Sequence, residues 1–153
     1  MSWKVKFLHQ ALKSTNDYIT AIELFGYCLY KTAKFEKALL CIGEGDNGKG
    51  TFLKLFERFV GLKNASHVSL QDMNSDRFSI ANLYGKLVNT FGDLPADKLK
   101  ATGNFKMLVS GDIIRAQNKH ADPFYFANHA LLVFSANAIP QSDDKSMHIL
   151  SAG

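Results

Sequence analysis

A glycine-rich stretch at residues 43–52, GEGDNGKGTF, is the part of the sequence whose residue types and spacing most clearly suggest chemistry. From Gly43 to Lys49 it follows the pattern G-x-x-x-x-G-K. In such a loop, successive backbone N–H groups surround a polyphosphate, and the lysine ammonium lies against its β- and γ-phosphates. The pattern therefore predicts a nucleotide site whose contacts come from Gly43, Gly45, Asp46, Asn47, Gly48, Lys49, Gly50 and Thr51.

The residue after the lysine departs from this pattern. A Ser or Thr is expected there, because its hydroxyl binds Mg²⁺, but the chain has Gly50 and places Thr51 one step later. Three interpretations are open. Mg²⁺ keeps an extra water at this position, as suits an ion that dehydrates reluctantly. Thr51 approaches the ion instead, or metal binding is weakened and the site is impaired.

The segments around the loop help to distinguish a nucleotide site from a glycine-rich turn that carries a surface lysine. Residues 38–42, ALLCI, form a short apolar run that favours a buried strand. Residues 51–60 carry apolar side chains at helical spacing, and Gly61 ends that pattern. A strand, a glycine loop and a helix in this order are the context that a phosphate loop requires, so we favour the nucleotide site.

Further helices and strands are expected on both sides of this unit. Helical periodicity covers residues 3–13 and 18–30, and Gly26 interrupts the second segment at a modest cost. Strands are expected at 86–93, 113–116 and 130–135, the second as the edge of a hairpin, and a helix at 97–108. Strands that alternate with helices predict an α/β domain with a parallel sheet.

Composition limits the class of protein. The 153 residues suffice for one domain with a hydrophobic core, and 46% of them are hydrophobic. Apolar runs are too short to cross a bilayer and the N-terminus has no apolar signal region, so we expect a cytoplasmic protein with no membrane partner. The net charge of +4 permits an anionic partner without requiring one. Cys28 and Cys41 are expected to be buried thiols, and the cysteine and histidine spacing predicts no zinc site.

Several segments, taken in order, resemble one known family. They are 24–29 (LFGYCL), 43–52, Gly85-Lys86 with Asp93, 106–112 (KMLVSGD) followed by Lys119-His120, and 134–140 (FSANAIP). Their order and spacing are similar to the helicase domain of phage and plasmid primase–helicases, which belong to superfamily III within the AAA+ class. The resemblance covers nearly the whole chain. It implies an α/β P-loop NTPase of AAA+ type that binds ATP and Mg²⁺, with a parallel sheet flanked by helices and a small N-terminal helical cap.

The resemblance also implies catalytic roles. Lys49 would hold the ATP phosphates together with the loop. Asp93, in the Walker B position at the end of a neighbouring strand, would hold Mg²⁺ through water and help to polarise the attacking water, and Thr51 is the other candidate Mg²⁺ ligand. Asn137, in the sensor position after the last strand, would orient water and sense the γ-phosphate. The alternative interpretations are that Asp93 is a solvated acid in a turn and that Asn137 only ends a strand. For both residues we favour the functional role.

Residues 110–126 are the candidate nucleic-acid element. In the resembling helicases this hairpin projects into a central channel and grips single-stranded DNA. Arg115, Lys119 and His120 are the candidate DNA-binding residues, because cations on a hairpin tip contact backbone phosphates. The alternative is a solvated basic turn. The aromatic residues Phe124, Tyr125 and Phe126 are close by, where they would stack on bases or fill the core, and we favour the core.

The same family works as a hexameric ring in which ATP lies between subunits and an arginine of the neighbouring subunit completes the site. Here no arginine follows Arg115. We therefore expect an N-terminal helical cap at 1–36, a helicase core at 37–146 that is incomplete at its C-terminus, and a tail at 147–153 outside the family pattern. Such a chain would be a fragment of a larger replication protein of a mobile element, or a naturally short reading frame.

Two functions follow as expectations. The first is the ATP-binding core of a DNA helicase, which in the complete protein couples ATP hydrolysis to translocation along single-stranded DNA. The second is a non-catalytic nucleotide- or DNA-binding accessory protein that associates with a full-length helicase ring. A small P-loop kinase is disfavoured, because the sequence shows neither an arginine-rich lid nor a convincing acceptor site after the sensor strand.

Overall fold

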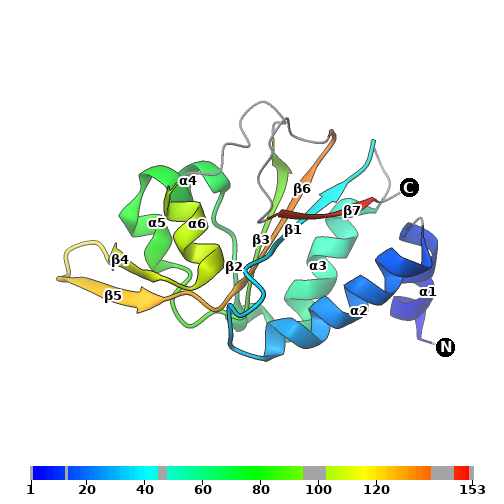
Figure 1. Ribbon diagram of the computed structural model, residues 1–153, viewed down its shortest axis with the longest axis horizontal. Coiled ribbons are helices and arrows are strands. Elements are labelled where there is room, and N and C mark those ends of the chain that lie inside the picture. The colour runs from blue at the N-terminus through cyan, green and yellow to red at the C-terminus, as the bar shows by residue number, and fades with distance from the viewer. Residues whose placement is uncertain (1, 13, 45–47, 95–102, 139–146, 152–153) are drawn as a thin grey trace.

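The computed structural model describes residues 2–12, 14–44, 48–94, 103–138 and 147–151. A sheet lies between two groups of helices (Figure 1). In chain order the elements are α1 (Trp3–Ala11), α2 (Thr15–Leu29), β1 (Ala38–Ile42), α3 (Lys49–Val60), the 3₁₀ helix η1 (Leu62–Asn64), β2 (Ala65–Ser66), α4 (Leu70–Ser75), α5 (Arg77–Ala81), β3 (Val88–Leu94), α6 (Gly103–Ser110), β4 (Ile113–Gln117), β5 (Pro123–Ala127), β6 (Leu131–Ala136) and β7 (Met147–Ser151).

Five parallel strands form the central sheet in the order β2-β3-β6-β1-β7. The strand β6 therefore lies between β1 and β3, and β4 and β5 form a separate antiparallel hairpin. Because the five strands run in one direction, the segments that follow β1, β3 and β6 meet at the same edge of the sheet. We call this edge the carboxyl edge. An α/β domain with a parallel sheet flanked by helices is the fold class that the sequence predicted.

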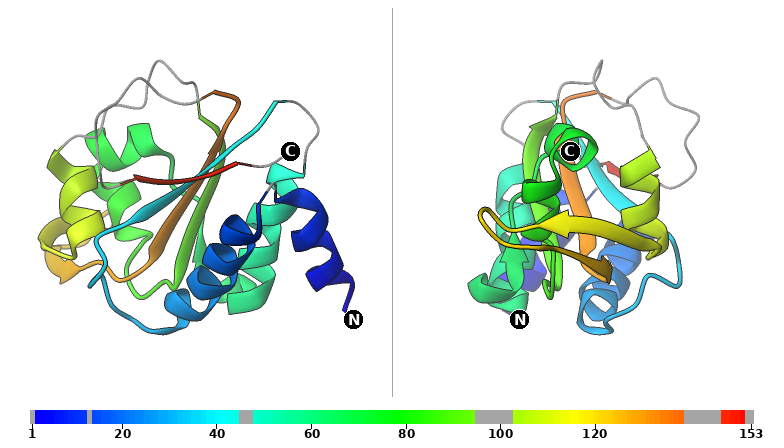
Figure 2. Two further views of the ribbon diagram at one scale, coloured as in Figure 1. Left: turned by 45° about the vertical axis from the view of Figure 1, so that its right-hand side comes forward. Right: turned by 90° about the vertical axis from the view of Figure 1, so that its left-hand side faces the viewer.

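Each face of the sheet is covered by its own hydrophobic cluster. Successive residues of a strand point to opposite faces, so Leu39 and Cys41 of β1 pack with α3, while Ala38 and Leu40 pack in the cluster that includes α6. The two views of Figure 2 show α1, α2 and α3 on one side of the sheet and α4, α5 and α6 on the other. The sheet is thus buried on both faces, as parallel sheets generally are.

The two N-terminal helices share the hydrophobic cluster of α3. The helix α2 starts after Ser14, whose hydroxyl accepts a hydrogen bond from the backbone N–H of Asp17 at 3.0 Å, a helix N-cap that satisfies a donor with no intrahelical partner. Further along the helix, the ring of Phe25 stacks on that of Phe56 in α3, with 4.0 Å between the ring centroids. This packing fixes α2 against the helix that follows the glycine loop.

The short elements between α3 and β3 were not expected from the sequence. The helices α4 and α5 are preceded by the N-cap residues Ser69 and Asp76, whose side chains accept hydrogen bonds from backbone N–H groups two or three residues later. Each helix is too short to show a helical period in the sequence. The helix expected at 97–108 is α6, which begins at Gly103, and residues 95–102 lie outside the described residues.

The segment 147–153, expected to be a tail outside the family pattern, contributes a strand to the sheet. The five residues of β7 pair in parallel with the five residues of β1, from Ala38 opposite Met147 to Ile42 opposite Ser151. The physical reason is the open edge of β1: its N–H and C=O groups on that side need partners, and only a segment distant in sequence supplies them. The sheet therefore extends beyond residue 146.

Both cysteines are free buried thiols, as predicted. Burial raises the pKa of the Cys28 thiol to about 11, and a hydrogen bond with the backbone of Cys28 itself acts in the opposite direction. Within the described ranges, no helix combines the length and the apolar character needed to cross a membrane.

Candidate functional site

The glycine loop connects β1 to α3 at the carboxyl edge. Gly48 is the N-cap of α3 and has φ 81°, a left-handed conformation that glycine adopts without strain. A Cβ atom at this position would also lie 3.2 Å from the ring of Phe7 in α1. Two independent constraints therefore require glycine at position 48. Gly45, Asp46 and Asn47, three of the predicted loop contacts, lie outside the described residues.

Lys49 is the first residue of α3, and its side chain is only 6% exposed. Its ammonium donates a hydrogen bond to the carbonyl of Gly43, so the side chain reaches back across the loop to the residue at which the loop begins. Burial raises the pKa of the Cys41 thiol far above its usual range, and the charge of Lys49 acts in the opposite direction. A buried cation thus lies at the N-terminus of α3, where the helix dipole adds further positive potential.

Gly50 and Thr51 follow on the exposed side of the helix start. A Cβ atom added to Gly50 would meet no heavy atom of the described residues within 4 Å, and its φ is not in the left-handed range. Neither packing nor backbone conformation explains this glycine. Thr51 is accessible to a ligand from solvent, but its side chain makes no described contact with Asp93 or Asn137.

Asp93 lies at an irregularity near the end of β3. Phe91 pairs with Phe134 and Leu94 with Ala136, so β3 has one residue more than β6 over this stretch, which is a β-bulge. The bulge gives Asp93 a φ of 55°, which Asp tolerates better than most residues, and leaves its side chain exposed. Its backbone N–H lies 3.3 Å from the hydroxyl of Ser135, which accepts the hydrogen bond.

Ser135 was not identified as a functional residue from the sequence. It is buried in β6, and a Cβ atom at Gly92 would lie 3.4 Å from its hydroxyl oxygen. The available signal was a single polar residue within the otherwise apolar run 130–136, ALLVFSA. Its hydroxyl links the middle strand of the sheet to the backbone that orients Asp93.

Asn137 follows β6 directly and is exposed. The backbone N–H of Gly43 lies 3.4 Å from the carbonyl of Ala136, which places the first residue of the glycine loop beside the residue preceding Asn137. The structure therefore places Gly43, Lys49, Asp93 and Asn137 at the carboxyl edge. Among the residues described, no three His, Cys, Asp or Glu side chains gather as a metal site.

The predicted DNA-binding residues lie elsewhere, on the hairpin formed by β4 and β5. Arg115, Lys119 and His120 are all exposed, and His120 has φ 61° in the turn. Figure 1 shows the hairpin beside α4, α5 and α6, away from the carboxyl edge. The loop and the hairpin are thus two separate regions of the molecule.

The aromatic residues of β5 do not share one environment, contrary to our expectation that all three fill the core. Phe126 is buried and Phe124 half-buried, and both rings contact Tyr84. Tyr125 is exposed and lies opposite Arg115 in the ladder. The reason is the two-residue period of a strand, which places Tyr125 on the face opposite its two neighbours.

The fold and this edge define a class of protein: a parallel α/β domain with a strand–glycine loop–helix unit, an acid near the end of β3, and an asparagine directly after β6, the strand between β1 and β3. The chain belongs to the family of unknown function DUF5906, whose profile matches residues 41–147. No curated protein matches the chain.

Several solved structures have a similar fold. An apo structure of the NrS-1 C-terminal region has a TM-score of 0.78 at 17% identity and covers 100% of this chain and 39% of that chain. An A-form apo structure of the same region has a TM-score of 0.74 at 19% identity, with 100% and 38% covered. JCV helicase bound to a thiazolopyridine-containing acetamide has a TM-score of 0.60 at 15% identity, with 96% and 44% covered.

The chain spans about two-fifths of the length of these structures. At such low identities the similarity shows the fold alone.

Proposed function

We propose that this chain is the ATP-binding core of a helicase-related DNA replication protein, a P-loop domain of AAA+ type. The observation that carries the proposal is the buried ammonium of Lys49, which lies at the N-terminus of α3 and donates to Gly43 at the carboxyl edge. A buried cation combined with a helix N-terminus attracts a polyanion. The phosphate oxygens of ATP would replace the Gly43 carbonyl as acceptors of the Lys49 hydrogen bond.

The residues at this edge fit Mg²⁺ as the accompanying ion. Mg²⁺ prefers oxygen ligands, keeps several waters and is held by one or two carboxylates together with substrate phosphates. Asp93 presents an exposed carboxylate on the β-bulge, and Thr51 presents an exposed hydroxyl at the start of α3. When bound, the ion would neutralise charge on the phosphates. The chain's own contribution is to hold the phosphates at Lys49 and to orient water through Asp93 and Asn137.

The helicase part of the proposal rests on the fold shared with JCV helicase and on the exposed cations of the hairpin. In the complete protein, ATP hydrolysis within a ring of subunits would drive translocation along single-stranded DNA held by Arg115, Lys119 and His120. Gly50, at the position where a Ser or Thr would bind Mg²⁺, favours a second candidate, a non-catalytic accessory protein that binds nucleotide or DNA and joins a full-length helicase ring. Both candidates share the nucleotide site.

Calorimetric titration with ATP, with and without Mg²⁺, tests this site. The Lys49→Ala variant is expected to bind about 10- to 100-fold more weakly than the native chain, since hydrogen bonds to charged groups contribute about 1.5–3 kcal/mol. Lys54→Ala is the matched control, because Lys54 is an exposed lysine on the same helix. If a folded native chain bound no ATP, or if both variants bound as the native chain does, the proposed site would be wrong.

A further inference from the structure

The helix α2 has a second apolar face that no part of the described chain covers. Ala21, Phe25 and Cys28 are buried against the core. On the adjoining side of the helix, Ile19, Ile22, Leu29 and the C-cap residue Tyr30 are between 45% and 72% exposed. With Gly26 they follow the three- and four-residue spacing of one helix face. We call these five residues the α2 outer face.

Gly26 lies at the middle of this face, and no contact within the described part of the chain requires glycine there. A Cβ atom there would meet no heavy atom of the described residues within 4 Å, and its φ is not in the left-handed range. A glycine inside a helix destabilises the helix relative to alanine. A surface glycine that no contact within the chain requires therefore indicates a contact with another molecule. On a helix surface, glycine allows the backbone of another helix to approach closely.

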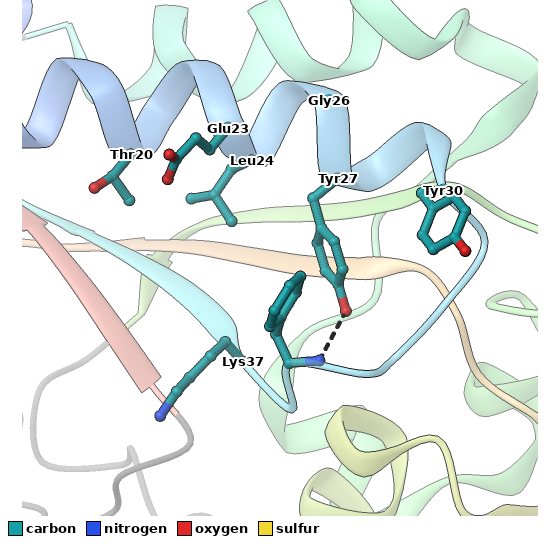
Figure 3. A pocket seen from close by; sticks show the side chains of 8 residues that line it. Thr20, Glu23, Leu24, Gly26, Tyr27, Tyr30 and Lys37 are labelled. Atoms are coloured by element: carbon teal, nitrogen blue, oxygen red, sulfur yellow. Dashed lines mark hydrogen bonds between the residues drawn. The ribbon is translucent and has the colours of Figure 1, made fainter.

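An apolar cavity adjoins the α2 outer face. Its volume is about 690 Å³, and both Gly26 and Tyr30 line it. Figure 3 shows the side chains of Tyr27 and Tyr30 pointing from α2 toward the segment that leads into β1. The Tyr27 hydroxyl accepts a hydrogen bond from the backbone N–H of Phe35 at 3.4 Å, which links α2 to the segment that leads into β1. A helix that packs on Gly26 therefore finds an apolar recess for a side chain beside it.

The face is complementary to itself when two copies run antiparallel. Ile19 and Ile22 precede Gly26 and Leu29 and Tyr30 follow it, so a two-fold axis at Gly26 lays each apolar half on the other half of the second copy. The flanking charges agree with this direction. Glu23 precedes Gly26, and the exposed lysines at 31 and 34 follow α2, so the antiparallel arrangement brings opposite charges together.

We propose that the α2 outer face is the interface with a second copy of this chain, in which the two α2 helices cross antiparallel at Gly26. The contact requires neither nucleotide nor DNA and does not depend on the proposed function. It is also distinct from a ring contact, because a two-fold interface closes after two copies.

Sedimentation of the full chain over a range of concentrations tests the proposal. A monomer–dimer equilibrium is expected, and both Ile22→Lys and Gly26→Leu should weaken it at least tenfold without changing the circular dichroism spectrum. Leu62→Lys is the matched control, because Leu62 is an exposed leucine outside this face and its replacement should leave dimerisation unchanged. A chain that stays monomeric, or a dimer that Ile22→Lys leaves intact, would overturn the proposal. If the chain stayed monomeric, the α2 outer face would instead be a binding surface for a different protein.

Cross-linking tests the position of the axis. Under mild oxidation with diamide, Gly26→Cys should form a covalent dimer, while Lys54→Cys, on the exposed side of α3, should not. The native thiols Cys28 and Cys41 are buried and contribute little background. Equal cross-linking of the two variants, or none at position 26 in a sample that sediments as a dimer, would exclude an axis at Gly26.

Discussion

At the scale of single residues, Gly50 is the position at which the loop departs from the usual phosphate-binding pattern. Its surroundings leave room for a side chain, and its backbone conformation does not require glycine. A hydroxyl could therefore be introduced without disturbing the packing of α3. This makes the role of the missing Ser or Thr open to a direct experiment.

We predict that Gly50→Ser strengthens Mg²⁺-dependent ATP binding several-fold, because it adds an oxygen ligand beside the phosphates. Gly50→Ala is the control. Alanine should raise the free energy of unfolding by up to about 1 kcal/mol through helix propensity while leaving the Mg²⁺ dependence unchanged. Calorimetry at several Mg²⁺ concentrations and urea unfolding separate the two effects. Identical Mg²⁺ dependence in the two variants would show that the hydroxyl is not what the site lacks.

The candidate site residues at the carboxyl edge were predictable from the sequence where they belong to one local pattern. Gly43, Gly48 and Lys49 are recognisable from spacing alone, since a strand–loop–helix unit is a local structure. The role of Ser135 was not recognisable, because its hydroxyl acts on the backbone of Asp93, a residue distant in sequence. The burial of Lys49 likewise depends on the loop folding back, which spacing does not show.

At the scale of elements, the bulge in β3 orients Asp93 by holding it in a left-handed conformation. We predict that Asp93→Asn keeps the stability of the native chain, because Asn also tolerates this conformation, but loses Mg²⁺-dependent ATP affinity. Asp93→Ala should lose the same affinity and about 1 kcal/mol of unfolding free energy as well. Calorimetry and urea unfolding measure the two quantities.

Asp122→Asn serves as the control for this pair, because it removes an exposed carboxylate far from the bulge. It should change neither quantity. If Asp93→Asn retained full Mg²⁺-dependent ATP binding, the carboxylate would have no role in holding the ion. The bulge would then affect only the pairing of β3 and not the ion site.

The hairpin of β4 and β5 allows a test of nucleic-acid binding. We predict that Lys119→Ala weakens binding to a single-stranded thymidine oligonucleotide and lowers the slope of log affinity against log salt by about 0.7, the value for one phosphate contact on a single strand. Fluorescence anisotropy at several salt concentrations measures both. The control Lys63→Ala removes an exposed lysine on η1, outside the hairpin. Equal effects of the two variants would point to nonspecific attraction by net charge.

Elements marked by a pattern in their own residues were predictable from the sequence, and an element specified by a distant partner was not. The boundaries expected for β1 agree with the structure, and those of β6 differ by one residue, because continuous apolar runs between polar segments indicate buried strands. The strand β7 was taken for a tail because nothing within its five residues specifies pairing. Its partner is β1, so only the assembled sheet defines it.

At the scale of the whole molecule, β7 protects the outer side of β1. Removal of residues 147–153 should lower the free energy of unfolding by about 2–5 kcal/mol, since each of the lost backbone hydrogen bonds contributes about 0.5–1.5 kcal/mol net. Removal of residues 152–153 alone is the control and should have little effect. Urea unfolding measures the difference, and equal stability of the two shortened chains would show that β7 adds nothing to the sheet.

The strand order has a consequence for how the protein is made. The ribosome releases β1 before every other strand, yet both neighbours of β1 in the sheet, β6 and β7, are the last two strands to emerge. Pairing between segments so distant in sequence is slow, because the intervening chain must first be ordered. Until then the apolar residues Leu39 and Leu40 have no sheet to enter, and a nascent chain of this kind is a natural client for chaperones. The strand that begins the sheet is therefore the last to be enclosed by its neighbours.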